Sequence, residues 1–166
     1  KDLIFQNREY WRLLTSIFNF GPLGFHAVIN IFFFLRNMGS VEGLFFSGRP
    51  LDFLFFTAFG IFMFFLYALK NSTLFFGSML ASYFIYYDSK RTPENPVFLI
   101  GIPFPIKHAY LPLIFLGTSF MGGSSIKSDL YAYSVSHLFF FIHDVINVKY
   151  NKSFLYLPDS ANRFVI

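Results

Sequence analysis

Long uncharged runs separated by short polar segments dominate the chain. Charged residues, prolines and glycines mark where each run begins and ends. They predict five membrane-spanning helices, at residues 22–35, 52–69, 73–87, 109–121 and 129–146. The pattern therefore predicts an all-α integral membrane protein built as a helical bundle.

No membrane span is predicted in the remaining segments. Residues 1–20 are predicted to form an amphipathic or loop segment. Residues 97–108 contain Gly101, Pro103 and Pro105 among apolar residues, which predicts a re-entrant or surface-lying loop. Residues 147–166 form a polar tail, so we divide the chain into a membrane domain (1–146) and a tail (147–166).

Two of the predicted spans are short. Residues 73–87 and 109–121 offer about 13–15 positions between their limits, whereas a typical hydrocarbon core needs about 20. Either these helices lie in a locally thinned bilayer, or the predicted boundaries are displaced by two to four residues. The sequence leaves both interpretations open.

Composition supports the membrane assignment. Of the 166 residues, 55% are hydrophobic and 13% are charged, which is too little charge to cover the surface of a soluble domain of this size. The absence of cysteine excludes disulfides and thiolate metal sites. The 28 phenylalanines indicate no binding function, because phenylalanine fills lipid-facing and packing positions about as well as leucine.

The distribution of lysine and arginine predicts an orientation. Eight of the 13 lie in the loops after the first and third spans and in the tail, and five lie on the opposite side. The positive-inside rule therefore places those two loops and the tail in the cytosol. Because the N-terminal segment then lies on the far side, we expect one further span upstream and six in all.

Five short motifs occur in order along most of the chain: EYWRLLTS at 9–16, FSGRPLDF at 46–53, DSKRTP at 88–93, KHAYLP at 107–112 and VSHLFFFIHDV at 135–145. The first resembles the L1-loop signature of the rhomboid superfamily. The others are similar to the derlin patterns F-x-G-R-x-x-D-F, W-S-R-R-x-P, K-A-x-Y-L-P and x-G-H-x-Y-Y-F-L-x-D-V. The chain thus resembles a derlin with a rhomboid-like bundle, and its signature residues are Trp11, Arg12, Gly48, Arg49, Asp52, His137 and Asp144.

The resemblance implies a multi-pass protein of the endoplasmic reticulum membrane that acts without proteolysis. Derlins move misfolded proteins to the cytosol for ubiquitin-dependent degradation. Their partners are membrane lipid, misfolded substrates, ubiquitin-ligase membrane complexes and a cytosolic AAA ATPase, with homo- or hetero-oligomers possible. The tail from residue 150 to residue 166 has no glycine, so it lacks the F-x-G-x-G-Q-R type box by which many derlins dock the ATPase.

An active rhomboid-type serine protease is the first alternative. Rhomboid proteases pair a histidine on the last span with the serine of a Gly-x-Ser-Gly motif. Here Gly77 is followed by Ser78, Met79 and Leu80, so that motif is not present. Ser78 and His137 remain a weak alternative dyad, because nucleophilic catalysis needs the hydroxyl and the imidazole within hydrogen-bond reach.

Polar residues inside the spans suggest a second kind of site. Small hydroxyl groups usually promote helix packing. Alternatively, some line a laterally open polar groove, for which the candidates are Asn30, Ser78, Ser82, Ser136 and His137. We expect Asp144 at the membrane edge, and His143 at the interface.

No histidine pair has the spacing of a metal site, and we expect no metal, no cofactor and no nucleic-acid partner. A transporter or channel is disfavoured because the spans contain almost no charge. A derlin relative used for protein import into a complex plastid remains an alternative to the reticulum role.

Overall fold

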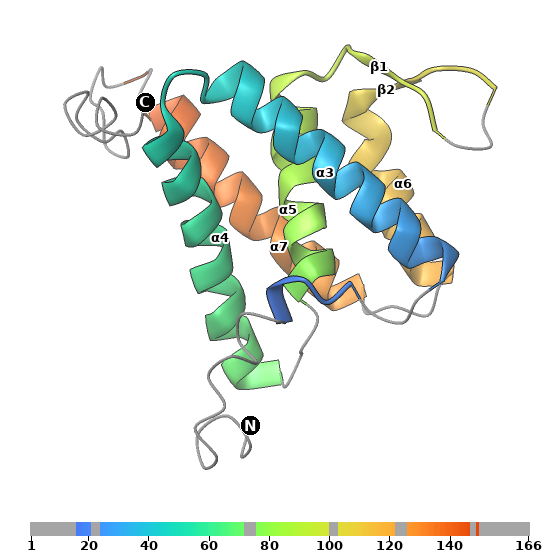
Figure 1. Cartoon of the computed structure of the whole chain (residues 1–166), viewed down its shortest axis with the longest axis horizontal. Coiled ribbons are helices and arrows are strands. Elements are labelled where there is room, and N and C mark those ends of the chain that lie inside the picture. The colour runs from blue at the N-terminus through green and yellow to red at the C-terminus, as the bar shows by residue number, and fades with distance from the viewer. Residues whose placement is uncertain are drawn as a thin grey trace.

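A computed structural model places five α-helices within the part of the chain that it describes (Figure 1). The structure describes residues 16–20, 24–71, 76–99, 103–121, 126–146 and 149. The helices are α3 (Phe25–Phe45), α4 (Pro50–Asn71), α5 (Phe76–Arg91), α6 (Leu111–Met121) and α7 (Ile126–Phe140). A π-helical turn, η2 (Phe141–Ile146), continues α7.

Successive helices alternate in direction. The last turns of α3, α5 and α7 and the first turns of α4 and α6 lie at the upper end of the molecule in Figure 1. We call this the hairpin end, because a two-stranded antiparallel ladder also lies there. In that ladder β1 (Pro96–Val97) pairs with β2 (Ile106–Lys107). The described part of the loop predicted at 97–108 therefore contains a hairpin and no spanning helix.

Helix α5 is the centre of the bundle and packs against each of the other four helices. Phe56 of α4 stacks on Tyr83 with ring centroids 4.5 Å apart and also contacts Tyr87 and Phe139. A smaller apolar cluster holds α3 to α6 through Phe33 and Phe115, whose ring centroids are 4.9 Å apart. Aromatic packing around α5 thus fixes where the polar side chains of this helix can lie.

Gly77 marks a second close approach to α5. Its backbone N–H donates to the carbonyl of Asn19 at 3.1 Å, and a Cβ at this position would lie 2.8 Å from the same oxygen. Only a residue without a side chain allows the 17–19 segment to lie this close.

The predicted helix boundaries agree best for α4, which begins and ends within two residues of the predicted span 52–69. Helix α3 continues ten residues beyond residue 35, where the first span was predicted to end. The first predicted span includes no charged residue, but the helix continues through Arg36, and Asn37 Nδ2 donates to the Phe33 carbonyl one turn earlier at 2.6 Å. A charged residue after an apolar run limits the apolar segment, but the helix itself can continue beyond that residue.

Helices α5 and α6 are short. Their 16 and 11 residues correspond to about 24 Å and 17 Å of rise, compared with about 30 Å of hydrocarbon. Among the described helices only α4 is long and apolar enough to cross a membrane alone, and the apolar stretch His108–Met121 is shorter. The helical class is confirmed, whereas the number of spans stays a prediction.

Candidate functional site

Polar contacts follow the line along which α5 packs on α7. Ser82 Oγ donates to Asp129 Oδ1 at 3.0 Å, and Ser136 Oγ donates to the Tyr83 carbonyl at 2.9 Å. Farther along, a 3.0 Å hydrogen bond joins the Tyr86 hydroxyl to His137 Nδ1. Partners on both helices advance in the same direction, so α5 and α7 run parallel with a polar seam between them.

The residues proposed to line a groove do not share one surface. Asn30, Ser82 and Ser136 are buried, and the two serines are bonded across the seam. His137 is exposed and Ser78 is half-buried. Of these five residues, His137 is therefore the polar group most open to the surroundings.

Ser78 and His137 are not brought together. The hydrogen bond of the His137 imidazole goes to Tyr86, which follows Ser78 by eight residues on the same helix. Eight residues correspond to about 12 Å along a helix axis, well beyond hydrogen-bond reach. This geometry does not support a nucleophile–base pair.

Asp144 holds the π-turn against the end of α5. Its carboxylate forms an ion pair with Arg91 and accepts from the Tyr87 hydroxyl at 3.2 Å. The Arg91 guanidinium also lies over the Phe45 ring, 4.8 Å from the centroid. His143 is bonded to Asp144 and stacks on Phe139. The His143 side chain is only 2% exposed, so it packs inside the bundle, and its place at the membrane interface stays a prediction.

The signature residues between α3 and α4 build a turn. Gly48 has φ +74°, a conformation that favours glycine, and Arg49 forms a 2.8 Å ion pair with the buried Asp52. The Arg49 carbonyl accepts the N–H groups of Asp52 and Phe53, so the first turn of α4 begins there. Asp52 in that turn also complements the helix dipole. Trp11 and Arg12 lie outside the described residues.

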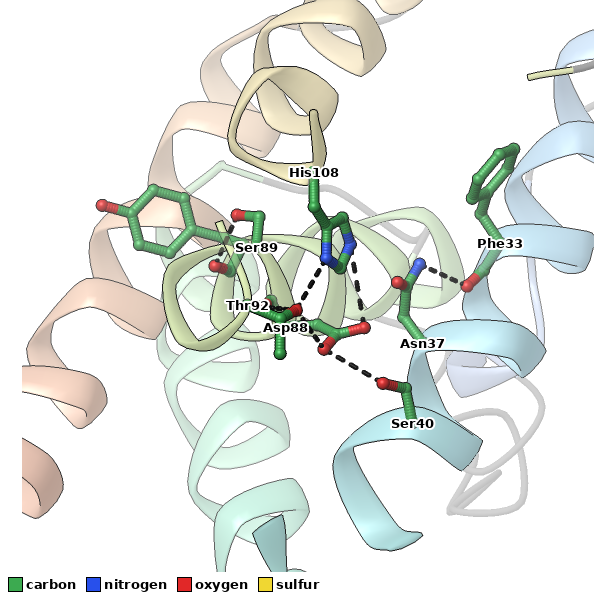
Figure 2. A network of polar contacts seen from close by, with 8 residues as sticks. Phe33, Asn37, Ser40, Asp88, Ser89, Thr92 and His108 are labelled. Atoms are coloured by element: carbon green, nitrogen blue, oxygen red, sulfur yellow. Dashed lines mark hydrogen bonds and ion pairs between the residues drawn. The ribbon is translucent and has the colours of Figure 1, made fainter. Parts of the chain in front are cut away.

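A buried cluster that the sequence analysis did not single out lies at the hairpin end, around Asp88 and His108 (Figure 2). The hairpin turns the chain back, so that the His108 N–H donates to the Asn95 carbonyl at 2.9 Å. His108 Nε2 then lies 3.7 Å from Asp88 Oδ2. Ser40 Oγ of α3 donates to Asp88 Oδ1 at 3.1 Å. Three elements distant in sequence thus converge on one carboxylate.

Burial perturbs both titratable groups of this cluster, which lie just outside the predicted spans 73–87 and 109–121. Burial raises the pKa of Asp88 to about 6. Hydrogen bonds from Ser40 and Thr92 and the charge of Arg36 lower the pKa, but by less than burial raises it. Burial, and then Arg36, lowers the pKa of His108 to about 4. Near neutral pH the cluster therefore holds an ionised carboxylate beside a neutral imidazole.

A comparison with the derlin patterns could have marked Asp88 and His108 as unusual residues, although not as neighbours in the fold. Asp88 stands where the pattern W-S-R-R-x-P has tryptophan, and His108 stands where K-A-x-Y-L-P has alanine. Two polar residues in place of two apolar ones are an unusual change in a membrane domain. Within the described residues, no three His, Cys, Asp or Glu side chains come together as a metal-binding group.

Comparison with known proteins identifies the family. A sequence model of the Der1-like family matches residues 1–159, so the chain belongs to the Der1-like family. It is 29% identical over 163 residues to a probable derlin-2 homolog of Dictyostelium discoideum, covering 94% of this chain and 64% of that protein. It is 27% identical to derlin-2.2 of Arabidopsis thaliana, covering 94% of this chain and 68% of that protein. The derlin resemblance is confirmed, and the chain spans about two thirds of the length of these curated relatives.

Proposed function

We propose that this protein is a non-proteolytic derlin that takes part in moving misfolded proteins from the endoplasmic reticulum to the cytosol for degradation. The observation that carries the proposal is the family match over residues 1–159. In this proposal the protein is a multi-pass component of the reticulum membrane, and the lysine and arginine distribution favours a cytosolic position for the hairpin end and the tail.

The bundle supports a role in passage through a membrane. Helices α5 and α6 are shorter than a typical hydrocarbon core is thick, and local thinning of the bilayer is one way in which such helices are accommodated. The exposed His137 adds a hydrogen-bonding group in the middle of the last predicted span. In this proposal, a polar segment of a substrate crosses a thinner apolar layer next to this bundle and can hydrogen-bond to His137 on the way.

The absence of proteolysis is part of the proposal. The imidazole of His137 is engaged by Tyr86, and Ser78 lies about two turns away along α5. The partners we propose are misfolded substrates, a ubiquitin-ligase membrane complex and a cytosolic AAA ATPase that other components recruit.

Degradation of a misfolded lumenal reporter tests the role. In cells that lack their own derlins, we expect the full-length protein to restore the decay of the reporter, followed after translation is blocked. The Ser78→Ala variant should restore it equally. If the wild type does not restore reporter decay, the proposal is contradicted. It is also contradicted if Ser78→Ala loses activity and the purified wild type cleaves a transmembrane substrate. Localisation of the tagged protein to a membrane around a plastid would favour the import alternative.

The exposed polar group provides a sharper variant. Replacing His137 with leucine removes one exposed hydrogen bond to Tyr86 and no buried one, so the protein should still fold while export of the reporter slows. Leu138→Val, a change at the neighbouring exposed position, is the matched control. Equal export rates in wild type, His137→Leu and Leu138→Val would show that His137 plays no part.

A further inference from the structure

The hairpin formed by β1 and β2 has two sides of opposite character. Successive residues of an extended chain point to opposite sides. Val97 is buried and belongs to an apolar cluster with Ile85 of α5 and Leu111 of α6. Phe98, the next residue, is 68% exposed. The inner side of the hairpin is therefore packed on the bundle, and the outer side presents an aromatic ring to the surroundings.

Further exposed apolar residues follow Phe98 along the chain. Phe104 is 62% exposed, and the prolines on either side of it, Pro103 and Pro105, are exposed as well. After β2, Tyr110 and Leu113 are exposed, and their spacing of three residues places them on one side of the helical segment that begins α6. Exposed apolar side chains thus continue from the hairpin into a helix of the bundle.

The hairpin lies at the level where the helices of the bundle end. Figure 1 shows its two strands extending to the side, across the direction of α5 and past the upper end of α6. At its base the Ala109 N–H donates to the Pro93 carbonyl at 3.1 Å, and together with the buried Val97 this holds the hairpin in place. In a membrane-spanning bundle the ends of the helices lie near the boundary between hydrocarbon and headgroups.

The backbone of a two-stranded ladder limits how deep the hairpin can lie in a membrane. Each strand has an outer edge whose N–H and C=O groups face away from the ladder, and such an edge is not tolerated in contact with hydrocarbon. Pro96 and Pro105 reduce the number of unpaired donors, because proline has no N–H. Exposed phenylalanine rings, in turn, are unfavourable in water. The headgroup region, which contains both water and the upper part of the acyl chains, meets both requirements.

The charges at the hairpin balance each other. Lys107 Nζ lies 2.7 Å from Glu94 Oε2, and both side chains are exposed, so the pair stays hydrated at the level of the headgroups. We propose that the outer side of the hairpin, with Phe98 and Phe104, inserts into the headgroup region of the membrane leaflet at the hairpin end. The partner of this surface is lipid, bound through apolar contact and without a requirement for anionic headgroups. This inference rests on the membrane placement in the proposed function.

Fluorescence of single labelled cysteines tests the insertion, because the 166 residues contain no cysteine of their own. The full-length protein is labelled with the dye NBD and reconstituted into phosphatidylcholine vesicles. Phe98→Cys and Phe104→Cys replace exposed side chains, so both variants should fold as the wild type does. Their labels should be quenched by lipid brominated near the headgroup and only weakly by aqueous iodide.

Two further labels calibrate the depth. Asn95→Cys, at an exposed polar position directly before β1, should be quenched mainly by iodide. Phe62→Cys, on the exposed side of α4, should be quenched most by lipid brominated deep in the acyl chain. If the hairpin labels respond to iodide as Asn95→Cys does while Phe62→Cys responds to lipid, the insertion is wrong and the proposed function stands. If Phe62→Cys does not respond to lipid either, the membrane placement fails, and this inference fails with it.

A charge introduced at Phe98 should also change the depth of the label at position 104. In Phe104→Cys, the added substitution Phe98→Asp should reduce quenching by the brominated lipid about twofold or more, because a carboxylate is unfavourable in contact with acyl chains. Asn95→Asp is the control for the added charge and should leave the quenching unchanged, as should phosphatidylserine added to the vesicles. Equal quenching with and without Phe98→Asp, or quenching that requires phosphatidylserine, would overturn the proposal.

Discussion

Helices α4 and α5 distribute their apolar residues in opposite ways. Helix α4 is the longer and more apolar, yet only Asp52, Phe56, Gly60 and Phe64 are buried, in one stripe at every fourth position. Helix α5 contains serine, tyrosine and aspartate, yet 12 of its 16 residues are buried. In lipid an apolar side chain gains little from burial, so small and polar side chains that can pack closely and hydrogen-bond favour the centre. Hydrophobicity therefore marks the periphery of this bundle.

The largest expected effect comes from truncating a buried aromatic ring of α5. Tyr83 is fully buried, stacks on Phe56 and donates to the Phe56 carbonyl at 3.1 Å. Tyr83→Ala should lower the free energy of unfolding by about 3–5 kcal/mol, as for other large aromatic truncations in a core. Phe62→Ala on α4, where the ring is 56% exposed, should change it by less than about 0.5 kcal/mol.

Unfolding in mixed micelles, followed by circular dichroism, measures both variants. Similar losses for Tyr83→Ala and Phe62→Ala would show that α4 is as tightly packed as α5, and would remove the contrast between the two helices.

A methyl group added to α5 should have the next largest effect. In Gly77→Ala the new Cβ would lie 2.8 Å from the Asn19 carbonyl oxygen, which is backbone and cannot rotate away. Overpacking of this kind costs roughly 1–3 kcal/mol, of which about 1 kcal/mol is offset by the better helix propensity of alanine. We expect a net loss of up to about 2 kcal/mol in the same unfolding measurement.

The control for this prediction has the opposite sign. A Cβ at Gly117 of α6 would meet no atom within 4 Å. Gly117→Ala should therefore gain up to about 1 kcal/mol from helix propensity alone. A gain in both variants would contradict the close approach of the 17–19 segment to α5.

How much of the fold could be predicted differs between these two helices. The limits of α4 were predicted within two residues, because Pro50 and Asp52 begin it and Lys70 and Asn71 end it in the sequence itself. Helix α5 has polar residues throughout, and its central position follows from contacts with four other helices. The periodicity of apolar residues along one segment does not show which other helices that segment contacts.

The candidate sites show the same limit. The turn at Gly48 and Arg49 is local, so its residues could be found by motif. The Asp88–His108 cluster depends on the register of the hairpin, in which Pro96 pairs with Lys107 and returns His108 to the end of α5. That register joins residues 11 positions apart and brings together Asp88 and His108, which are 20 apart, and no pattern in the intervening sequence specifies it. The burial of Ser82 and Ser136 could likewise not be predicted, because serine is compatible with both a buried and an exposed face of a helix.

The smallest expected effect separates two serines of α7. Ser136 is fully buried and donates to the Tyr83 carbonyl on α5, whereas the exposed Ser134 donates to Leu130 within its own helix at 2.8 Å. Ser136→Ala removes a bond between helices and should cost about 1 kcal/mol, while Ser134→Ala should change stability by less than about 0.5 kcal/mol. Both variants lose the same hydroxyl group, so the difference between their free energies of unfolding measures the contribution of the hydrogen bond between α5 and α7. Equal values would mean that α5 is held at the centre by its aromatic packing alone, without help from its hydrogen bonds to α7.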